Sequence, residues 1–182
     1  MDITDSLTPT DLPARKPDEL LTIALAGIIV QALRAERHPL IRGLSDARFQ
    51  KLLNEFFLDL TLTNNESDPG ARAAGDEFDD LVAMLLEYRA EPSEQYAWLA
   101  YAVASAAMGE NHLWQDMGLP NRRVLSDLMR EYFPSLAARN REDMKWKKFF
   151  YRQLCERADV PICKSPHCAG CCDYAVCFGP ED

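Results

Sequence analysis

The sequence predicts an all-α protein, a single helical domain that ends in a cysteine-rich, cluster-binding loop. Apolar residues recur at helical spacing along most of the chain, and no sustained run alternates Val, Ile and Thr with polar residues as a strand would. Five of the six cysteines fall between Cys163 and Cys177. A chain of 182 residues is most simply one domain with a substantial buried core.

Composition and spacing divide the chain into three parts. Residues 1–16 hold Thr, Ser, Asp and Pro without an apolar period, and we expect a mobile N-terminal segment there. Residues 17–158 form the predicted helical domain, and residues 159–182 form the cysteine-rich metal-cluster loop. The polar stretch 61–75, punctuated by Gly and Pro, predicts a flexible loop inside the helical domain.

The first half of the domain predicts four amphipathic or buried helices. Their starts are marked by proline, serine or acidic residues, as the first turn of a helix favours. Gly27 lies within the first of them and predicts a close helix crossing, because glycine there costs about 1 kcal/mol relative to alanine. The expected helices begin near Pro17, run from 45 to 57 and from 76 to 88, and restart at Ser93.

The second half predicts shorter helices before the cysteines. One ends at Gly118, and Pro120 prevents its continuation. Another carries the apolar stripe from Val124 to Tyr132. A third runs from about residue 140 to residue 155, with Asn140 or Asp143 as its expected N-cap.

Charge and hydropathy exclude several classes of protein. The net charge of −9 argues against a nucleic-acid binder. The longest apolar run, Leu20 to Leu33, is too short and too interrupted to span a bilayer. The first residues lack the basic and apolar regions of a secretory signal. We therefore expect a cytoplasmic protein with reduced thiols and neither a membrane nor a nucleic-acid partner.

The cysteine loop predicts a metal centre. Cys163, Cys168, Cys171 and Cys177 give the spacing C-x4-C-x2-C-x5-C, whose first part matches plant-type iron–sulfur ligation. Zinc sites more often use two separated pairs, and only one C-x2-C pair occurs here, but zinc and disulfides remain alternatives. Cys172 is the expected spare thiol because adjacent residues rarely face the same site.

A cationic stretch precedes the cysteine loop. From Arg139 to Arg157, seven Lys or Arg stand against three acids, a local charge of +4 in a chain of −9. Lys145, Lys148 and Arg152 recur at i, i+3 and i+7 and share a predicted helix face. This face is either simply solvated or a counter-charge for a thiolate cluster, an oxyanion or an acidic partner.

Two histidines are secondary candidates for the metal site. His167 lies inside the cysteine loop, whereas His112 is more simply a hydrogen-bonded or partly exposed histidine.

No Ser-His-Asp order, glycine-rich phosphate loop or HExxH motif occurs, so a hydrolytic enzyme is not indicated. Nothing except the cysteine loop predicts chemistry, and we expect a carrier rather than an enzyme.

Several stretches together resemble the NifQ family of nitrogen-fixation proteins. The resemblance covers residues 95–180, and the cysteine spacing completes it, followed by Phe178-Gly179. Its other residues read His112-Leu-Trp-Gln-Asp-Met-Gly-Leu119, Phe133-Pro-Ser-Leu-Ala-Ala-Arg-Asn140 and Met144-Lys-Trp-Lys-Lys-Phe-Phe-Tyr-Arg152.

The resemblance implies a role in making the iron–molybdenum cofactor of nitrogenase. Such proteins are thought to carry a molybdenum–iron–sulfur cluster, of [4Fe-4S] or [3Fe-4S] type with molybdenum, and to donate the molybdenum. The motif places the ligands on Cys163, Cys168, Cys171 and Cys177, with Cys172 as an alternative register. The implied partners are molybdate or another molybdenum source and the cofactor-assembly proteins, namely the scaffold complex and the iron protein.

Two rival classes share part of the pattern. A DNA-repair glycosylase of all-α fold ends in C-x6-C-x2-C-x5-C, but this chain has x4 first, is acidic and lacks the helix-hairpin-helix turn. A zinc-stabilised interaction module is the other. Metal content separates the molybdenum donor from the interaction module, because the donor requires iron, sulfide and molybdenum, and the module requires zinc alone.

Overall fold

The computed structural model describes residues 7–16, 19–65, 77–159, 168 and 171–181. Within these ranges the fold is all-helical, as predicted, with one isolated antiparallel bridge between Ala14 and Phe57. None of the described helices is both long enough and apolar enough to cross a membrane. The elements are η2 (Pro9–Asp11), α1 (Leu20–Arg34), α2 (Asp46–Phe56), α3 (Phe78–Tyr88), α4 (Glu94–Ala107), α5 (Leu113–Asp116), α6 (Arg122–Tyr132), α7 (Pro134–Ala137), α8 (Trp146–Arg157) and α9 (Tyr174–Phe178).

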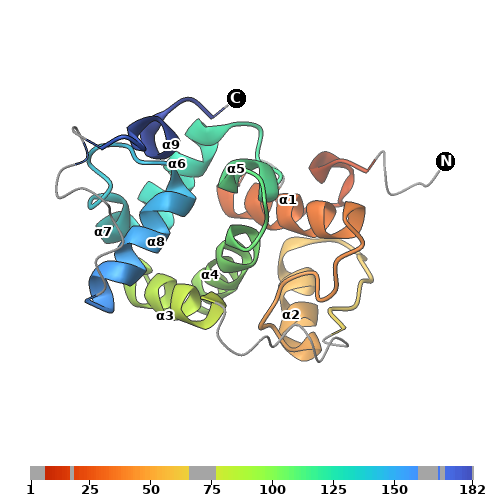
Figure 1. The fold of residues 1–182 in the computed structure, drawn as a ribbon. Helices are drawn as coiled ribbons and strands as arrows, with labels where there is room; N and C mark the ends of the chain where they lie inside the picture. The colour runs from red at the N-terminus through yellow and green to blue at the C-terminus, as the bar shows by residue number, and fades with distance from the viewer. Residues whose placement is uncertain (1–6, 17–18, 66–76, 160–167, 169–170, 182) are drawn as a thin grey trace.

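Helix α4 is the central element of the fold. It packs against α1, α3 and α5, while α3 also contacts α7 and α8 (Figure 1). Nine residues of α4 are buried, most of them alanines, and the small side chains allow its neighbours to approach closely. The chain therefore wraps its later helices, α5 to α9, around one side of an α1–α3–α4 core.

The close approach predicted at Gly27 is present, but it is made to the turn that follows α5 rather than to the body of another helix. A Cβ on Gly27 would clash with the carbonyl oxygen of Met117, and one on Gly118 would lie 2.7 Å from the Gly27 carbonyl oxygen. Gly118 has a φ of +63°, the left-handed conformation expected for a glycine just past the end of a helix. Backbone-to-backbone contact between α1 and the end of α5 thus fixes the position of the α5 region.

The two segments expected to lack regular structure are partly ordered. In the N-terminal segment, Leu12 is buried, and the N–H of Arg15 donates to the carbonyl of Phe56 at 2.8 Å. In the 61–75 stretch, the fully buried Asn64 side chain donates to the carbonyls of Ile41 and Leu44. A single apolar or amide side chain can anchor a polar segment, which periodicity does not reveal. Residues 1–6 and 66–75 lie outside the described residues.

The helix before the cysteine loop begins later than predicted. Helix α8 starts at Trp146, with Lys145 as its N-cap and no side-chain cap. Neither Asn140 nor Asp143 caps it. Asn140 instead accepts a hydrogen bond from the N–H of Met144 at 2.9 Å, while Asp143 adopts a φ of +56°. The local hydrogen bonding of an Asn side chain has competed with the helix, as it does in turns.

Candidate metal centre and the cationic helix beside it

The described cysteines of the loop lie on one short segment that ends in α9. The N–H of Cys171 donates to the carbonyl of Cys168 at 3.0 Å, and the N–H of Tyr174 donates to that of Cys171 at 3.1 Å. These bonds curl the chain on both sides of Cys171. Cys163 and His167, the other predicted candidates in this loop, lie outside the described residues.

Two adjacent thiols and one carboxylate come together. The sulfurs of Cys171 and Cys172 and a carboxylate oxygen of Asp173 all lie within 4.8 Å of one another. Although the two cysteines are adjacent in sequence, the sulfur of Cys172 lies close to that of Cys171, and both residues stay candidate ligands. The sulfurs of Cys168 and Cys177 fall outside this group, so the predicted four-thiolate set stays a prediction.

The cysteine segment is docked on the start of α8. The carbonyl of Cys177 accepts a hydrogen bond from the N–H of Lys145 at 2.8 Å. Cys168, Cys177 and Phe178 also pack against the hydrophobic core. This contact matters for function, because it places the thiols beside the cationic helix rather than on an unattached tail.

Glu181 anchors the chain after α9. Its carboxylate is 4% exposed and lies 3.7 Å from Nδ1 of His112 and 3.4 Å from Nε of Arg122. His112 is partly exposed and has a carboxylate neighbour, and its role at a metal stays a prediction. Glu181 follows the last cysteine by four residues and was not singled out by the sequence, because no periodic pattern connects it with His112, 69 positions earlier.

Arg152 reaches the cysteine segment directly. Its Nη1 donates to Sγ of Cys168 at 3.4 Å, and its Nε donates to Glu156 at 3.0 Å. A guanidinium at a sulfur offsets the negative charge of a thiolate-bound cluster. The expected counter-charge role thus has a specific contact at this one residue.

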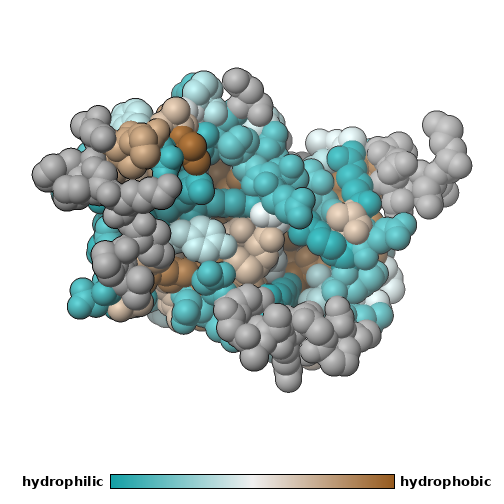
Figure 2. Space-filling view, viewed as in Figure 1, coloured by the Kyte–Doolittle hydropathy of each residue, from teal (hydrophilic) through white to brown (hydrophobic). Residues whose placement is uncertain are grey.

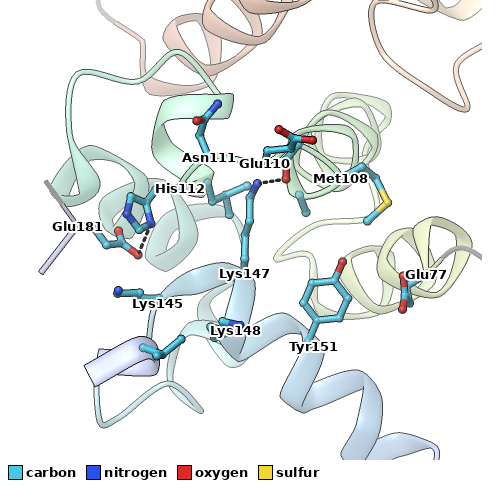
Figure 3. A pocket seen from close by; sticks show the side chains of 14 residues that line it. Glu77, Met108, Glu110, Asn111, His112, Lys145, Lys147, Lys148, Tyr151 and Glu181 are labelled. Carbon is cyan, nitrogen blue, oxygen red and sulfur yellow. Dashed lines mark hydrogen bonds and ion pairs between the residues drawn. The ribbon is translucent and has the colours of Figure 1, made fainter. Parts of the chain in front are cut away.

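Lys145 and Lys148 face a different hollow from Arg152. Both line a cavity of about 620 Å³ together with His112, Tyr151 and Val176, whereas Arg152 lines a separate one of about 310 Å³. Figure 3 shows the first cavity between α8 and the chain around α5. The three cations predicted to share one face are therefore divided between two sites.

Lys147 forms a buried contact that the sequence did not predict. Its Nζ lies 2.5 Å from Asp116 and 2.7 Å from the carbonyl of Gly109. The Asp116 carboxylate also accepts hydrogen bonds from the backbone and side chain of Asn111. Because Lys147 and Asp116 are 31 residues apart, no helical spacing pairs them. Lys147 thus connects α8 to α5 through Asp116 and to the loop between α4 and α5 through Gly109. Lys147 and Gly109 line the 620 Å³ cavity.

Apolar side chains are exposed on α9 beside the thiols. Tyr174 is 48% exposed and Val176 is 52% exposed. Figure 2 shows hydrophobic surface at the place of α9, next to the hydrophilic surface of neighbouring helices. Cys172 is exposed and Cys171 is half-buried, so the thiols are accessible from outside the molecule.

The donor atoms fit a soft metal better than a hard one. Thiolates select zinc, copper(I) and iron–sulfur clusters, whereas carboxylates and carbonyls select magnesium and calcium. The described residues offer four sulfurs within ten positions and a guanidinium at one of them. The chemistry of this donor set therefore fits an iron–sulfur type of cluster.

Fold and site together define an all-helical protein whose thiol-rich segment is docked on a cationic helix. Comparison with known proteins identifies its family. The NifQ family model matches residues 24–179, and the chain belongs to the NifQ family. No solved structure matches it.

Curated relatives agree with this assignment. A protein named Protein NifQ from Rhodobacter capsulatus is 38% identical over 87% of this chain and 89% of its own length. Protein NifQ from Azotobacter vinelandii is 44% identical over 58% of this chain, and the match spans about half of that relative, 54%. A Protein NifQ homolog from Sinorhizobium fredii is 34% identical over 75% of this chain and 60% of its own length.

Proposed function

We propose that this chain carries a molybdenum–iron–sulfur cluster on its C-terminal cysteines and donates molybdenum for the iron–molybdenum cofactor of nitrogenase. Membership of the NifQ family supports the pathway, as the resemblance of the motifs implied. The observation that carries the proposal is the docking of the cysteine segment on α8, with the Arg152 guanidinium at the Cys168 sulfur. In this role the chain is a cytoplasmic carrier rather than an enzyme.

Accessibility of the thiols suits a donor. A cluster that must be handed over needs an exposed site, and residues 171–176 lie largely at the surface. The exposed Tyr174 and Val176 border the same site and offer apolar contacts to an acceptor. The acceptors in this proposal are the cofactor-assembly proteins, namely the scaffold complex and the iron protein, and the source of the metal is molybdate.

Metal analysis of anaerobically purified protein tests the cluster. We expect iron, acid-labile sulfide and molybdenum, with an electron paramagnetic resonance signal of a paramagnetic cluster. Cys168→Ser and Cys177→Ser should each lose iron and sulfide, and comparison of Cys171→Ser with Cys172→Ser identifies the ligand of that pair. Cys155→Ser is the matched control because Cys155 lies on α8, outside the loop. Zinc at one per chain without sulfide would support the interaction module and overturn the proposal.

Donation is tested by transfer. Cluster-loaded chain is mixed with cofactor-assembly proteins that lack molybdenum, and formation of active cofactor is followed. We expect transfer from the wild-type chain and none from Cys168→Ser. Equal cofactor formation with both chains would show that the thiols are not the source of the molybdenum.

A further inference from the structure

The cavity of about 620 Å³ between α8, α9 and the α4–α5 region has a cationic end. Lys145 and Lys148 line it, and within the described residues neither ammonium group forms an ion pair. Lys147 lines it as well, but its charge is taken up by Asp116. Two ammonium groups from one turn of chain are therefore available to a ligand.

Hydrogen-bond donors and carboxylates are unevenly distributed around the cavity. Figure 3 shows Lys145, Lys148 and the His112 ring toward one end, with Glu77 at the other. Glu181 also lines the cavity, but it is 4% exposed and already has His112 and Arg122 as partners. The uncompensated positive charge is thus concentrated near the start of α8.

This distribution selects the size and charge of a ligand. A compact dianion can contact both ammonium groups and the imidazole at the cationic end. A long polyanion such as a nucleoside triphosphate would extend toward Glu110 and Glu77, whose carboxylates repel it. The cavity is partly open to solvent, so a highly hydrated ion can enter without losing its whole hydration shell.

The cavity adjoins the cysteine segment. Val176 of α9 lines it, and the next residue, Cys177, accepts the hydrogen bond from the N–H of Lys145. A ligand at Lys145 therefore lies beside the backbone that carries the thiols, in a cavity separate from the hollow lined by Arg152. We propose that this cavity is a binding site for a small tetrahedral oxyanion, with Lys145 and Lys148 as its charged contacts. The inference rests on the proposed function for the identity of that oxyanion, molybdate.

Equilibrium dialysis of the full chain against molybdate, with bound molybdenum measured by mass spectrometry, tests the site. Thiolates must be prevented from binding the metal, so the chain carries serine at Cys163, Cys168, Cys171, Cys172 and Cys177. We expect this chain to bind molybdate with an affinity that falls with ionic strength. Lys145→Gln/Lys148→Gln in the same background should weaken binding by about tenfold or more, because the loss of a single charged contact is worth roughly that factor.

The control variant is Arg34→Gln/Lys51→Gln, which removes the same charge from exposed positions on α1 and α2. We expect it to bind as the parent does. Equal binding by both double variants, or no binding by the parent chain, would overturn the proposal. A circular dichroism spectrum confirms that each variant is helical, and Lys145→Gln/Lys148→Gln in the wild-type background repeats the comparison with the thiols present.

Competition and metal content separate this inference from the proposed function. Sulfate and phosphate are added to the dialysis buffer as competitors. At a molybdate-selective site they displace molybdate only weakly, whereas at a general oxyanion site they displace it at concentrations similar to its own. Either result supports an oxyanion site. Iron and sulfide are measured separately on the wild-type chain. Their absence would contradict the cluster and leave the cavity result standing, whereas their presence with no molybdate bound would contradict the cavity alone.

Discussion

Helices α4 and α8 differ in what their side chains do. Nine of the fourteen residues of α4 are buried, and its central Trp98 and Leu99 are almost inaccessible. Only four of the twelve residues of α8 are buried, and its other side includes Lys147, Lys148 and Arg152. We infer that α4 mainly supplies stability, whereas α8 uses a narrow apolar face to hold cations at two separate hollows, with Arg152 at the Cys168 sulfur. Substitutions should therefore have different consequences in the two regions.

The largest expected effect is on the α4 side. Trp98 is 1% exposed and meets Phe56 edge to face, with ring centroids 6.2 Å apart. Trp98→Ala should lower the free energy of unfolding by about 3–5 kcal/mol, because it opens a large cavity. Tyr174→Ala on α9 should change it by less than about 0.5 kcal/mol, since that ring is half exposed. Urea unfolding measures both, and equal losses would contradict the mainly stabilising role of α4.

Lys147 is the exception that sharpens the comparison, because it is a cation of α8 with a structural role. Lys147→Met should cost about 2–3 kcal/mol, since it leaves the nearly buried Asp116 carboxylate without its partner. Lys148→Met, the neighbouring exposed lysine, should cost less than about 0.5 kcal/mol. Thermal unfolding compares them. If Asp116→Asn fails to recover part of the loss in Lys147→Met, the pair is not the cause.

Arg152 should affect the cluster more than the fold. Its contact with Cys168 is partly exposed, and removing the positive charge should lower the reduction potential of the cluster. For Arg152→Gln we expect a decrease on the order of 50 mV, or about 1 kcal/mol per electron, with partial recovery in Arg152→Lys. Redox titration followed by electron paramagnetic resonance gives the value. An equal decrease in Arg157→Gln, whose partner is Glu87, would refute a specific role for Arg152.

The smallest expected effect on stability is that of breaking an exposed ion pair at the start of α4. The Arg48 guanidinium donates to Glu94 at 2.9 Å and lowers the pKa of that carboxyl below its ordinary value. A lowered pKa in the folded state stabilises the fold at pH values above the pKa that glutamate has in the unfolded chain. This contribution is lost as the pH falls through the pKa of the folded state. Glu94→Gln should therefore cost a few tenths of a kcal/mol at pH 7 and less in acid. Melting temperatures at both pH values check this, and a loss that persists in acid would contradict the cause.

Local patterns predicted the fold where one short stretch determines the structure. Ser45 precedes the apolar stripe of α2, and its side chain caps that helix by accepting from the N–H of Arg48. Gly27 and Gly118 predicted a crossing and a helix end because only glycine permits those backbone positions. The start of α8 was misplaced because the Asn140 side chain competes for the N–H of Met144.

The sequence predicted which types of residue form the site, but not which residues contact one another there. The spacing of the cysteines identified the segment, and the cationic run identified α8. The partners of Lys147 and His112 lie 31 and 69 positions away. The division of Lys145 and Lys148 from Arg152 depends on which other segments pack against each side of α8. Periodicity within one helix holds no information about such contacts.

X-ray absorption at the molybdenum edge tests the central claim most directly, because it identifies the atoms around the metal. The sample is cluster-loaded chain that has been dialysed free of molybdate and carries Lys145→Gln/Lys148→Gln, so that oxyanion in the cavity does not contribute. The proposed carrier predicts sulfur atoms around molybdenum with iron as the next neighbours, and loss of both in Cys168→Ser. Molybdenum surrounded by oxygen alone, or unchanged by Cys168→Ser, would contradict it.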